Sequence, residues 1–393
     1  MQAHPNIKWS SFLKDVLICS LGAYGGPEAH YGVFTDQMIV KKKYLSEDEL
    51  VELIALTGIL PGPSSTQTII SIGYKVGGPL LALLTLMVWA LPAIVIMTVL
   101  SFMYDVLVRV NLDANGLRYI GPMAVGFIVV ASYRIGKKVI KGYLTLSLFL
   151  MAGIITFFFR EPWVFPLVLL VGGLTTAIAS KEKGIWHHVK LNPPWKYLII
   201  FGVIALGTIM ASFIVNNRIL FIFEHFYRYG YLVIGGGQVV IPYMFTDLVE
   251  TFKFMTANEF LTGFGLVQGI PGPMFSFSAY AGGLAGREFS TFTQVMTALA
   301  AGLGIFLPGT LLIFFVYPMW EQLKAMRGIK LSLTGITAVA GGLIATAAVI
   351  LMRENGFAWD NLLVLVLTIL ILLSKKVPAP ILVILAILAG FLM

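Results

Sequence analysis

The stretch "GILPGPSSTQTIISIGYKVGG", residues 58–78, combines two prolines and repeated glycines with a run of hydroxyl and amide side chains. Proline removes a backbone donor and glycine weakens a helix, so the stretch predicts a helix break at Pro-Gly-Pro. A second stretch, "GFGLVQGIPGPMFSFSAYAGG" at 263–283, contains the same three residues. The fold of the whole chain has to accommodate both breaks.

The composition indicates a membrane protein. Of 393 residues, 58% are hydrophobic and 12% are charged, whereas a soluble chain has about 25% charged residues. Uncharged runs longer than the roughly 18 residues of a membrane-spanning helix cover 79–104, 197–217, 289–320 and 331–352. Shorter apolar runs cover 119–133, 142–159, 162–180, 361–374 and 377–393. We predict an all-α polytopic membrane protein.

The sequence aligns with itself after a shift of 210 residues. The matched positions are Gly25 and Gly26 with Gly235 and Gly236, Glu49 with Glu259, Pro61-Gly62-Pro63 with Pro271-Gly272-Pro273, and Gly73 with Gly283. This predicts two homologous repeats joined by a linker. The predicted parts are an N-terminal repeat at 1–180, a basic loop and linking transmembrane helix at 181–218, and a C-terminal repeat at 219–393.

Loop charge predicts that the second repeat is inverted. The loop at 134–141 carries four positive charges and no negative charge, and 181–196 and 321–330 are also basic. Positive loops stay on the cytoplasmic side, so we expect these three loops in the cytoplasm and the chain in the plasma (inner) membrane. The single linking helix at 197–217 then supplies the odd crossing that inverts the second repeat.

The Pro-Gly-Pro segments predict re-entrant hairpins, which enter and leave the membrane on one side. The arms on either side of each break are short, ~21 Å long for about fourteen residues, and do not span the hydrocarbon core alone. The predicted count is four spans, the linking span and four further spans, plus four hairpins. Broken single-pass helices remain an open alternative.

The residues around the breaks are suited to binding an anion. A new helix starts after each break, and its first backbone N–H groups have no partner within the helix. Such donors and the positive end of the helix dipole bind anions, and paired broken helices mark a transporter's binding site. The candidate substrate-binding residues are Gly25, Gly26, Pro61, Gly62, Pro63, Ser64, Ser65, Thr66, Gln67, Gly236, Gly237, Gln238, Pro271, Gly272, Pro273 and Ser276. Simple helix capping by the hydroxyl groups, and packing of the glutamines between helices, are the alternatives.

Four charged or titratable residues near the breaks have separate interpretations. Glu28 and His30 follow the first glycine pair and are candidates for proton coupling. Lys75 and Arg287 lie at the far ends of the arms, where they either attract an anion to the vestibule or extend to the membrane surface. The sequence contains no catalytic motif, and we expect no metal and no cofactor.

These motifs resemble those of the chromate ion transporter family. "YGGPEAH" at 24–30, "LPGPSSTQ" at 60–67 and "IGYKVGG" at 72–78 are similar to its first-half signature, and "GGGQVVIP" at 235–242 with "IPGPMFSFSAYAGG" at 270–283 to its second. The resemblance implies an inner-membrane carrier of chromate or sulfate-like oxyanions. It also adds weight to Pro27, Gly73, Tyr74, Val240, Pro242, Tyr280 and Gly283, with Pro27 and Tyr280 as further binding residues. Gly58 and Gln238 depart from the family, which often has a polar residue and a histidine there.

We therefore expect a secondary transporter of a tetrahedral oxyanion, working by alternating access as one half rocks against the other. Its partners are the oxyanion and the lipid bilayer, and not nucleic acid. The small residues at 281–286 suit hairpin packing or a homodimer face, and the sequence leaves both open. The alternatives are an oxyanion channel on the same scaffold and, from another class, a membrane-embedded enzyme acting on lipid phosphates.

Overall fold

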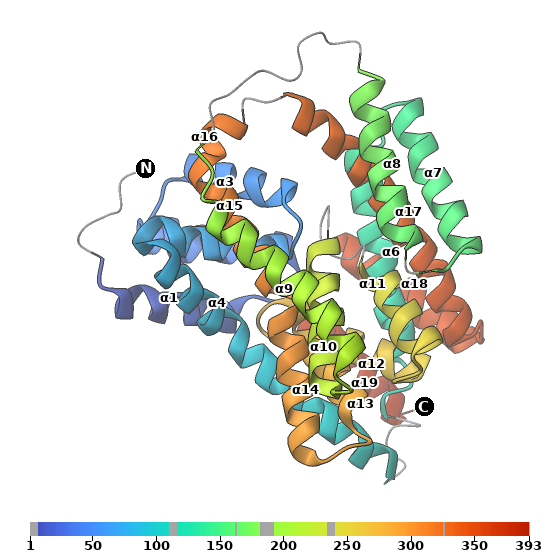
Figure 1. Cartoon of the computed structure of the whole chain (residues 1–393). Helices are drawn as coiled ribbons and strands as arrows, with labels where there is room; N and C mark the ends of the chain where they lie inside the picture. The colour runs from blue at the N-terminus through green and yellow to red at the C-terminus, as the bar shows by residue number, and fades with distance from the viewer. Residues whose placement is uncertain are drawn as a thin grey trace. The chain divides into compact units, whose positions relative to one another are not determined.

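The computed structural model describes residues 7–109, 116–161, 163–180, 192–233, 240–324 and 327–392. Every regular element within these ranges is a helix (Figure 1). Helices long and apolar enough to cross a membrane cover Ser64–Tyr104, Trp195–Ile214, Thr291–Leu323 and Leu331–Asn355. Shorter apolar helices cover Tyr143–Phe158, Val164–Ile178, Trp359–Ser374 and Ala379–Leu392. The chain is therefore an all-helical, multi-pass membrane protein, and the predicted apolar runs are confirmed as helices.

The chain forms two compact units, and each takes segments from both predicted repeats. Unit 1 consists of Met1–Arg109, Asn192–Tyr231 and Leu266–Trp320. Unit 2 consists of Val110–Leu191, Leu232–Gly265 and Glu321–Met393. The compact units are therefore not the two halves of the sequence.

Unit 1 contains both Pro-Gly-Pro breaks. Its helices in the first half are α1 (Trp9–Gly22), α2 (Pro27–Phe34), the π-helix η1 (Thr35–Lys41), α3 (Glu47–Ile59) and α4 (Ser64–Arg109). Its later helices are α9 (Trp195–Ile214), α10 (Arg218–Leu232), η3 (Met274–Ser276), α13 (Phe277–Gly286), α14 (Thr291–Gly304), α15 (Leu307–Val316) and η4 (Tyr317–Met319), with α16 (Trp320–Leu323) at its boundary.

The long helix α4 is divided by a kink. Gly77 and Gly78 leave the helical conformation, and Gly78 has a φ of 75° that residues with a Cβ rarely adopt. Pro79 follows and has no backbone donor for the turn before it. The kink separates a short arm next to the first break from the apolar span that begins at Leu80.

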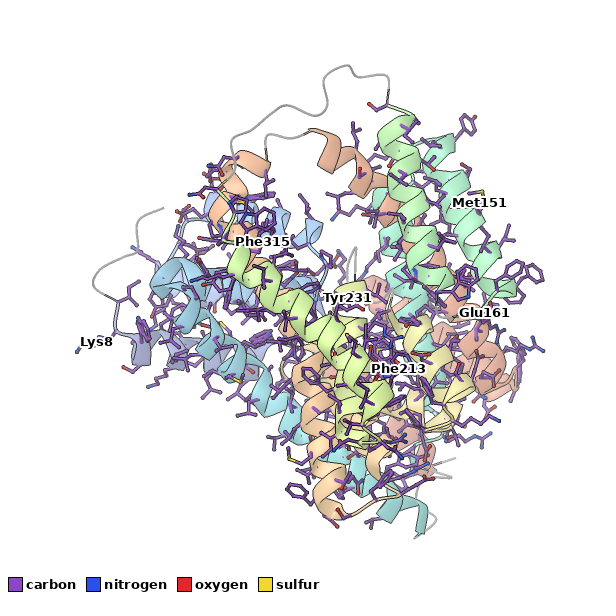
Figure 2. The ribbon with its side chains drawn as sticks, in the orientation of Figure 1. Lys8, Met151, Glu161, Phe213, Tyr231 and Phe315 are labelled. Atoms are coloured by element: carbon purple, nitrogen blue, oxygen red, sulfur yellow. The ribbon has the colours of Figure 1, made fainter. Side chains whose placement is uncertain are left out.

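The linking helix α9 is apolar on all sides. No residue of α9, the whole of which is described, is buried. Phe213, labelled in Figure 2, is 87% exposed. One side of α9 is half-buried and the helix packs against α15. Its other side exposes apolar residues, which are stable only in an apolar solvent, so that side faces lipid.

Unit 2 is built around one long helix. Its elements are α6 (Ile120–Val139), α7 (Tyr143–Phe158), α8 (Val164–Ile178), α11 (Val240–Phe245), the π-helix η2 (Thr246–Thr251), most of α12 (Ala257–Val267), α17 (Arg327–Asn355), α18 (Trp359–Ser374) and α19 (Ala379–Leu392). Helix α17 packs against α6, α7 and α8. Gly335 and Gly342 of α17 lie against the backbone of α8 and α7, so these helices approach closely.

Local backbone structure recurs at the offset of 210 residues. The π-helices η1 and η2 end at Lys41 and Thr251, and Lys43 and Lys253 have left-handed φ values of 54° and 52°. The N–H of Tyr44 donates to Met38 O at 2.8 Å, and the N–H of Phe254 donates to Leu248 O at 2.9 Å. These turns are therefore built alike in the two halves.

Candidate functional site

The first Pro-Gly-Pro break joins α3 to α4. Helix α3 begins with a capping box between Ser46 and Glu49, and it ends at Ile59. Gly62 has a φ of 132°, which a side chain would strain. Helix α4 then starts at Ser64, and the N–H of Gln67 makes the first helical bond, to Pro63 O at 2.9 Å. The preceding N–H groups are left without a carbonyl partner inside the helix.

His30 lies beside this helix start. Its side chain is 1% exposed, and Nδ1 is 2.9 Å from Ser65 Oγ. The ring also packs edge-on against Trp89, with centroids 5.4 Å apart. Nε2 is buried and has no hydrogen-bond partner among the described residues. A buried polar atom of this kind is rare in a protein and is commonly satisfied by a ligand or water.

Trp89 of α4 connects the first break to α1. Its indole Nε1 donates to Thr66 Oγ1 at 3.1 Å, directly after the break. Its backbone carbonyl accepts a hydrogen bond from Ser20 Oγ at 2.7 Å. Trp89 itself is fully buried. One turn of α4 therefore contacts both the first break and the end of α1.

The second Pro-Gly-Pro break lies against the same turn of α4. The N–H of Gly272 donates to Ala23 O at 2.8 Å. A Cβ on Gly272 would lie 2.9 Å from Ala93 Cβ and 3.6 Å from Ser20 Oγ. Gly272 also has a φ of 111°, close to that of Gly62. The two breaks, distant in sequence, are therefore brought together inside unit 1.

Gln67 holds the first break against α15. Its amide Nε2 donates to Pro61 O at 2.8 Å and to Gly309 O at 3.1 Å. The residue is 1% exposed. Its carbonyl oxygen Oε1 is buried and has no hydrogen-bond partner in the described part of the chain. The free atom of this side chain is therefore an acceptor.

The two breaks have similar backbone conformations but different side chains. The positions that match His30, Ser65 and Gln67 in the second half hold Val240, Phe275 and Phe277. Leu299 stands where Trp89 does in the first half. Ser276 matches Thr66; it is fully buried, and its hydroxyl lacks a partner within the described ranges. Among the described residues, His30, Ser65, Thr66 and Gln67 therefore gather at the first break, and the unpartnered hydroxyl at the second break is that of Ser276.

The other charged candidates are Lys75, Glu28 and Arg287. Lys75 pairs with Glu49, with side chains 5% and 38% exposed. Partial burial raises the pKa of the Glu49 carboxyl, but hydrogen bonds from Lys75 and from Ser46 outweigh it and hold the pKa below its ordinary value. Glu28 is exposed in the first turn of α2, and Arg287 follows the end of α13.

The remaining predicted residues are placed as follows. Gly25, Gly26 and Pro27 lie where α2 begins, after the Ala23 carbonyl that binds the second break. Tyr280 of α13 is buried and stacks on Phe277, with centroids 6.2 Å apart. Gly236, Gly237 and Gln238 lie outside the described residues. The structure therefore brings together the two Pro-Gly-Pro breaks, His30, Ser65 and Thr66.

Sequence reasoning missed Trp89, Ser20 and Gly309. Trp89 lies in a long apolar run, where a tryptophan ordinarily indicates packing or a membrane interface. Ser20 and Gly309 are small residues in apolar helices and carry no spacing signal. Their carbonyl and hydroxyl contacts appear only in three dimensions.

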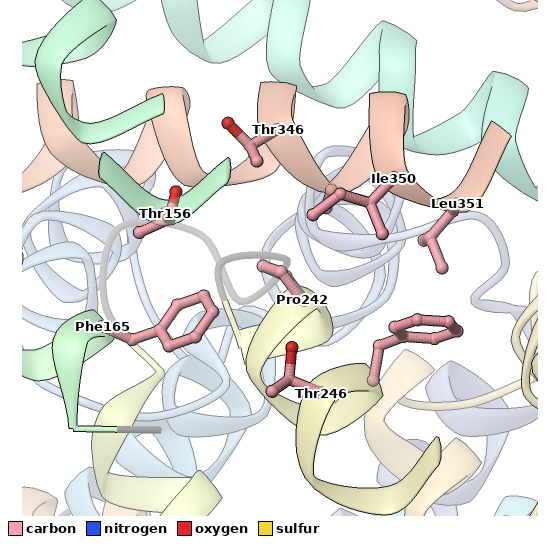
Figure 3. A pocket seen from close by; sticks show the side chains of 9 residues that line it. Thr156, Phe165, Pro242, Thr246, Thr346, Ile350 and Leu351 are labelled. Carbon is pink, nitrogen blue, oxygen red and sulfur yellow. The ribbon is translucent and has the colours of Figure 1, made fainter. Parts of the chain in front are cut away.

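A small cavity in unit 2 does not provide an alternative site. Its volume is about 10 Å³, and its walls are formed by Phe165, Pro242, Ile350 and Leu351 among others (Figure 3). The hydroxyls of Thr156 and Thr346, which also line it, donate to the carbonyls of Ala152 and Gly153 at 2.7 and 2.8 Å. A space of this size holds at most a single water molecule.

Comparison with known proteins identifies similar chains. A family model described as chromate transporter matches residues 10–177 and 220–391. A probable chromate transport protein of Synechococcus elongatus is 23% identical, with 99% of this chain and 97% of that protein aligned. The chromate transport proteins of Pseudomonas aeruginosa and Cupriavidus metallidurans are 24% and 23% identical, over 88% and 92% of this chain and 81% and 87% of theirs. No solved structure matches the chain significantly.

Proposed function

The chain belongs to the chromate transporter family, and on that premise we propose that it is a secondary transporter of a tetrahedral oxyanion, with chromate as a substrate. Relatives aligned over most of their length are named chromate transport proteins. Their names agree with the expectation that the chain is a transporter and not an enzyme. The lipid-phosphate enzyme is therefore set aside.

The start of α4 beside His30 is the observation that carries the proposal. Three features converge there: backbone N–H groups without a carbonyl partner inside α4, the hydrogen bond between Ser65 Oγ and His30 Nδ1, and the buried, unpartnered Nε2. Neutral donors at a helix N-terminus bind an oxyanion without a fixed opposite charge. An anion held in this way is also released again, as transport requires. Of the two candidates for proton coupling, His30 is the one at this site.

Inverted repeats with re-entrant hairpins form the proposed scaffold. Two observations support a duplication. The family model matches the chain twice, and the π-helices and the lysines with left-handed φ values recur in both halves. The arms beside the breaks support hairpins, because α3 has 13 residues, α12 has 11 and α13 has 10. Such helices are too short to span the roughly 30 Å hydrocarbon core. The basic segment 134–141, which was expected to be a loop, is mostly the C-terminal end of α6 (Ile120–Val139). This segment and 321–330 face the cytoplasm in this arrangement, as does loop 181–196, most of which lies outside the described residues.

Alternating access in this scaffold moves the compact units and not the sequence halves. Inside unit 1, Gln67 of the first half bonds Gly309 of the second half. Gly272 of the second half bonds Ala23 of the first half. Rocking of one half against the other would break both contacts next to the anion. Motion of unit 1 relative to unit 2 preserves them.

Flux measurements with the purified protein in proteoliposomes test the proposal. Ser65 Oγ and His30 Nδ1 share one hydrogen bond, so the neutral pair presents one donor to the anion: Nε2–H or the Ser65 hydroxyl, according to the tautomer. H30A and S65A each disrupt this pair and should raise the chromate concentration for half-maximal flux roughly 10- to 150-fold, because a hydrogen bond to a charged group contributes about 1.5–3 kcal/mol. S71A is the matched control, since the Ser71 hydroxyl donates to Gln67 O at 2.8 Å within the same helix. It should leave the flux unchanged.

The same assay separates the alternatives. Flux that follows an imposed pH gradient or a trans anion identifies a carrier and its coupling. Selective flux that ignores both gradients identifies a channel on this scaffold. If no oxyanion crosses the membrane, or if H30A and S65A transport chromate like the wild type, the proposed site is wrong.

A further inference from the structure

The Gln67 amide folds back onto the break that precedes its own helix. Its Nε2 reaches Pro61 O, which lies before the helix begins. A Cβ added to Gly62 would lie 2.5 Å from Nε2 and 2.8 Å from Cδ of Gln67. The amide group therefore packs directly on Gly62. Its Oε1, attached to the same Cδ atom, is held at the break as well.

The orientation of this amide is determined by its neighbours. Nε2 points at two carbonyl oxygens, those of Pro61 and Gly309. Exchanging the positions of Nε2 and Oε1 would bring three oxygen acceptors together with no donor between them. Oε1 is therefore the atom left over. It is a buried acceptor without a donor in the residues that the structure describes.

An acceptor in this place distinguishes between oxyanions. The start of α4 and the hydrogen-bonded pair of His30 and Ser65 offer donors, which suit any oxyanion. A fully ionised anion such as sulfate has only acceptor oxygens, so it leaves Oε1 unsatisfied. Its negative charge is also repelled by the partial negative charge of Oε1. A singly protonated anion carries one O–H that Oε1 can accept. Burial strengthens this discrimination, because no bulk water replaces the missing donor.

We propose that Gln67 Oε1 accepts the O–H hydrogen of a singly protonated oxyanion, so that the site prefers hydrogenchromate and similar anions to sulfate. This inference rests on the proposed function. The preference comes from the first break, since Phe277 holds the matching position at the second break. Gln67 therefore selects the protonation state of the anion by the polarity of this hydrogen bond.

Competition at a fixed pH of about 7 tests the proposal in the wild-type protein. Chromate flux into proteoliposomes is measured against added phosphate, which keeps at least one proton near neutral pH, and against sulfate, which has none. Phosphate should inhibit at a concentration at least tenfold lower than sulfate. Equal inhibition by the two anions would overturn the proposal. Equal inhibition is also the result expected if a water molecule, and not the anion, donates to Oε1.

A substitution then assigns the preference to Gln67. Q67K keeps N–H donors for Pro61 O and Gly309 O but removes the acceptor, so the phosphate-to-sulfate preference should fall at least tenfold. The added charge attracts a dianion more than a monoanion, so the ratio for Q67K is compared with the wild type at a pH well above the second pKa of phosphate, where phosphate and sulfate carry the same charge and only phosphate has an O–H. S71A is the control and should keep the wild-type ratio. A Q67K protein that transports chromate with an unchanged ratio would show that Gln67 does not select.

These outcomes are distinct from failure of the proposed function. If no oxyanion is transported by the wild-type protein, the transport proposal itself is wrong. If chromate is transported but sulfate competes as well as phosphate, the transport proposal stands and the role of Gln67 Oε1 is wrong. The wild-type competition decides this even where Q67K does not fold.

Discussion

Lys75 is a residue whose charge is buried and compensated locally. Its side chain is 5% exposed and pairs with Glu49. The capping glutamate at the matching position of the second half is Glu259, but Ala285 stands where Lys75 does. The pair therefore distinguishes two otherwise similar helix starts. This contact supports a structural role for Lys75.

E49Q should destabilise the protein by about 1–2 kcal/mol more than E47Q does, since Glu47 is exposed in the same first turn of α3. Glutamine still fits a capping box, but it leaves the Lys75 ammonium buried without a counter-charge. The estimate is reduced because Glu49 is 38% exposed. Thermal unfolding in detergent, followed by tryptophan fluorescence, measures the difference. Equal destabilisation by the two variants would contradict this account of Lys75.

The same pair predicts a dependence on pH. The pKa of Glu49 is lowered in the folded protein, so its stabilisation is complete above the ordinary glutamate pKa and is lost as the pH falls through the lowered value. The wild type and E49Q should therefore converge in stability at acid pH, where the wild-type carboxyl is protonated. A difference that persists or grows in acid would exclude the ion pair as its source.

Residue chemistry at the breaks could be predicted only in part. The run Ser64, Ser65 and Thr66 identified a helix start rich in donors, and His30 was identified as a titratable group near it. The amide of Gln67 was expected to donate to the anion, but its donors are occupied by Pro61 and Gly309. Gly309 is 242 residues away, and no local pattern predicts such a pairing.

At the scale of elements, the break at Gly62 requires a residue without a side chain. A Cβ there would lie 3.0 Å from Gly309 Cα, and the φ of 132° is unfavourable for any side chain. G62A should cost about 2–4 kcal/mol and abolish transport. G58A is the control, because no described atom lies within 4 Å of its Cβ position in α3, and it should stabilise by about 0.5–1 kcal/mol. Transport by G62A at the wild-type rate would contradict the tight break.

Helix positions were predictable, whereas π-helices were not. Apolar runs predicted α6 to α9 and α17 to α19 because uncharged length alone indicates a membrane helix. The π-helices η1 and η2 have no propensity signal of their own, and such turns are often found at functional sites. The kink of α4 lies at Gly77 and Gly78, before Pro79. These residues follow Lys75, which was expected at the far end of an arm.

At the scale of the whole molecule, the sequence predicted two halves and the structure shows two composite units. In unit 2, a Cβ on Gly172 would lie 3.3 Å from Val339 Cβ, and one on Gly126 would lie 2.9 Å from Thr368 Cβ. Each pair joins the first half to the second. Such contacts between distant segments depend on topology, which composition and periodicity do not encode.

Disulfide bonds between these pairs test which bodies move. With Cys19, the single native cysteine, replaced by alanine, G172C/V339C and G126C/T368C place their Cβ atoms 3.3 and 2.9 Å apart. These distances are below the 3.5–4.5 Å of a disulfide, so the paired helices must separate slightly for either bond to form. Oxidised protein should retain at least half of the reduced protein's chromate flux, because both bonds lie inside unit 2. Loss of flux on oxidation, restored by a reductant, would show that the halves move against each other.

The composite units also determine when the chain is able to fold during its synthesis. Unit 1 needs Leu266–Trp320, and Leu266 lies 157 positions after Arg109. A ribosome adding about 5–20 residues per second takes roughly 8 to 30 s to cover that distance. Through that interval the nascent first half waits in the membrane with its broken helix lacking the α15 partner. Early truncation therefore leaves neither unit complete.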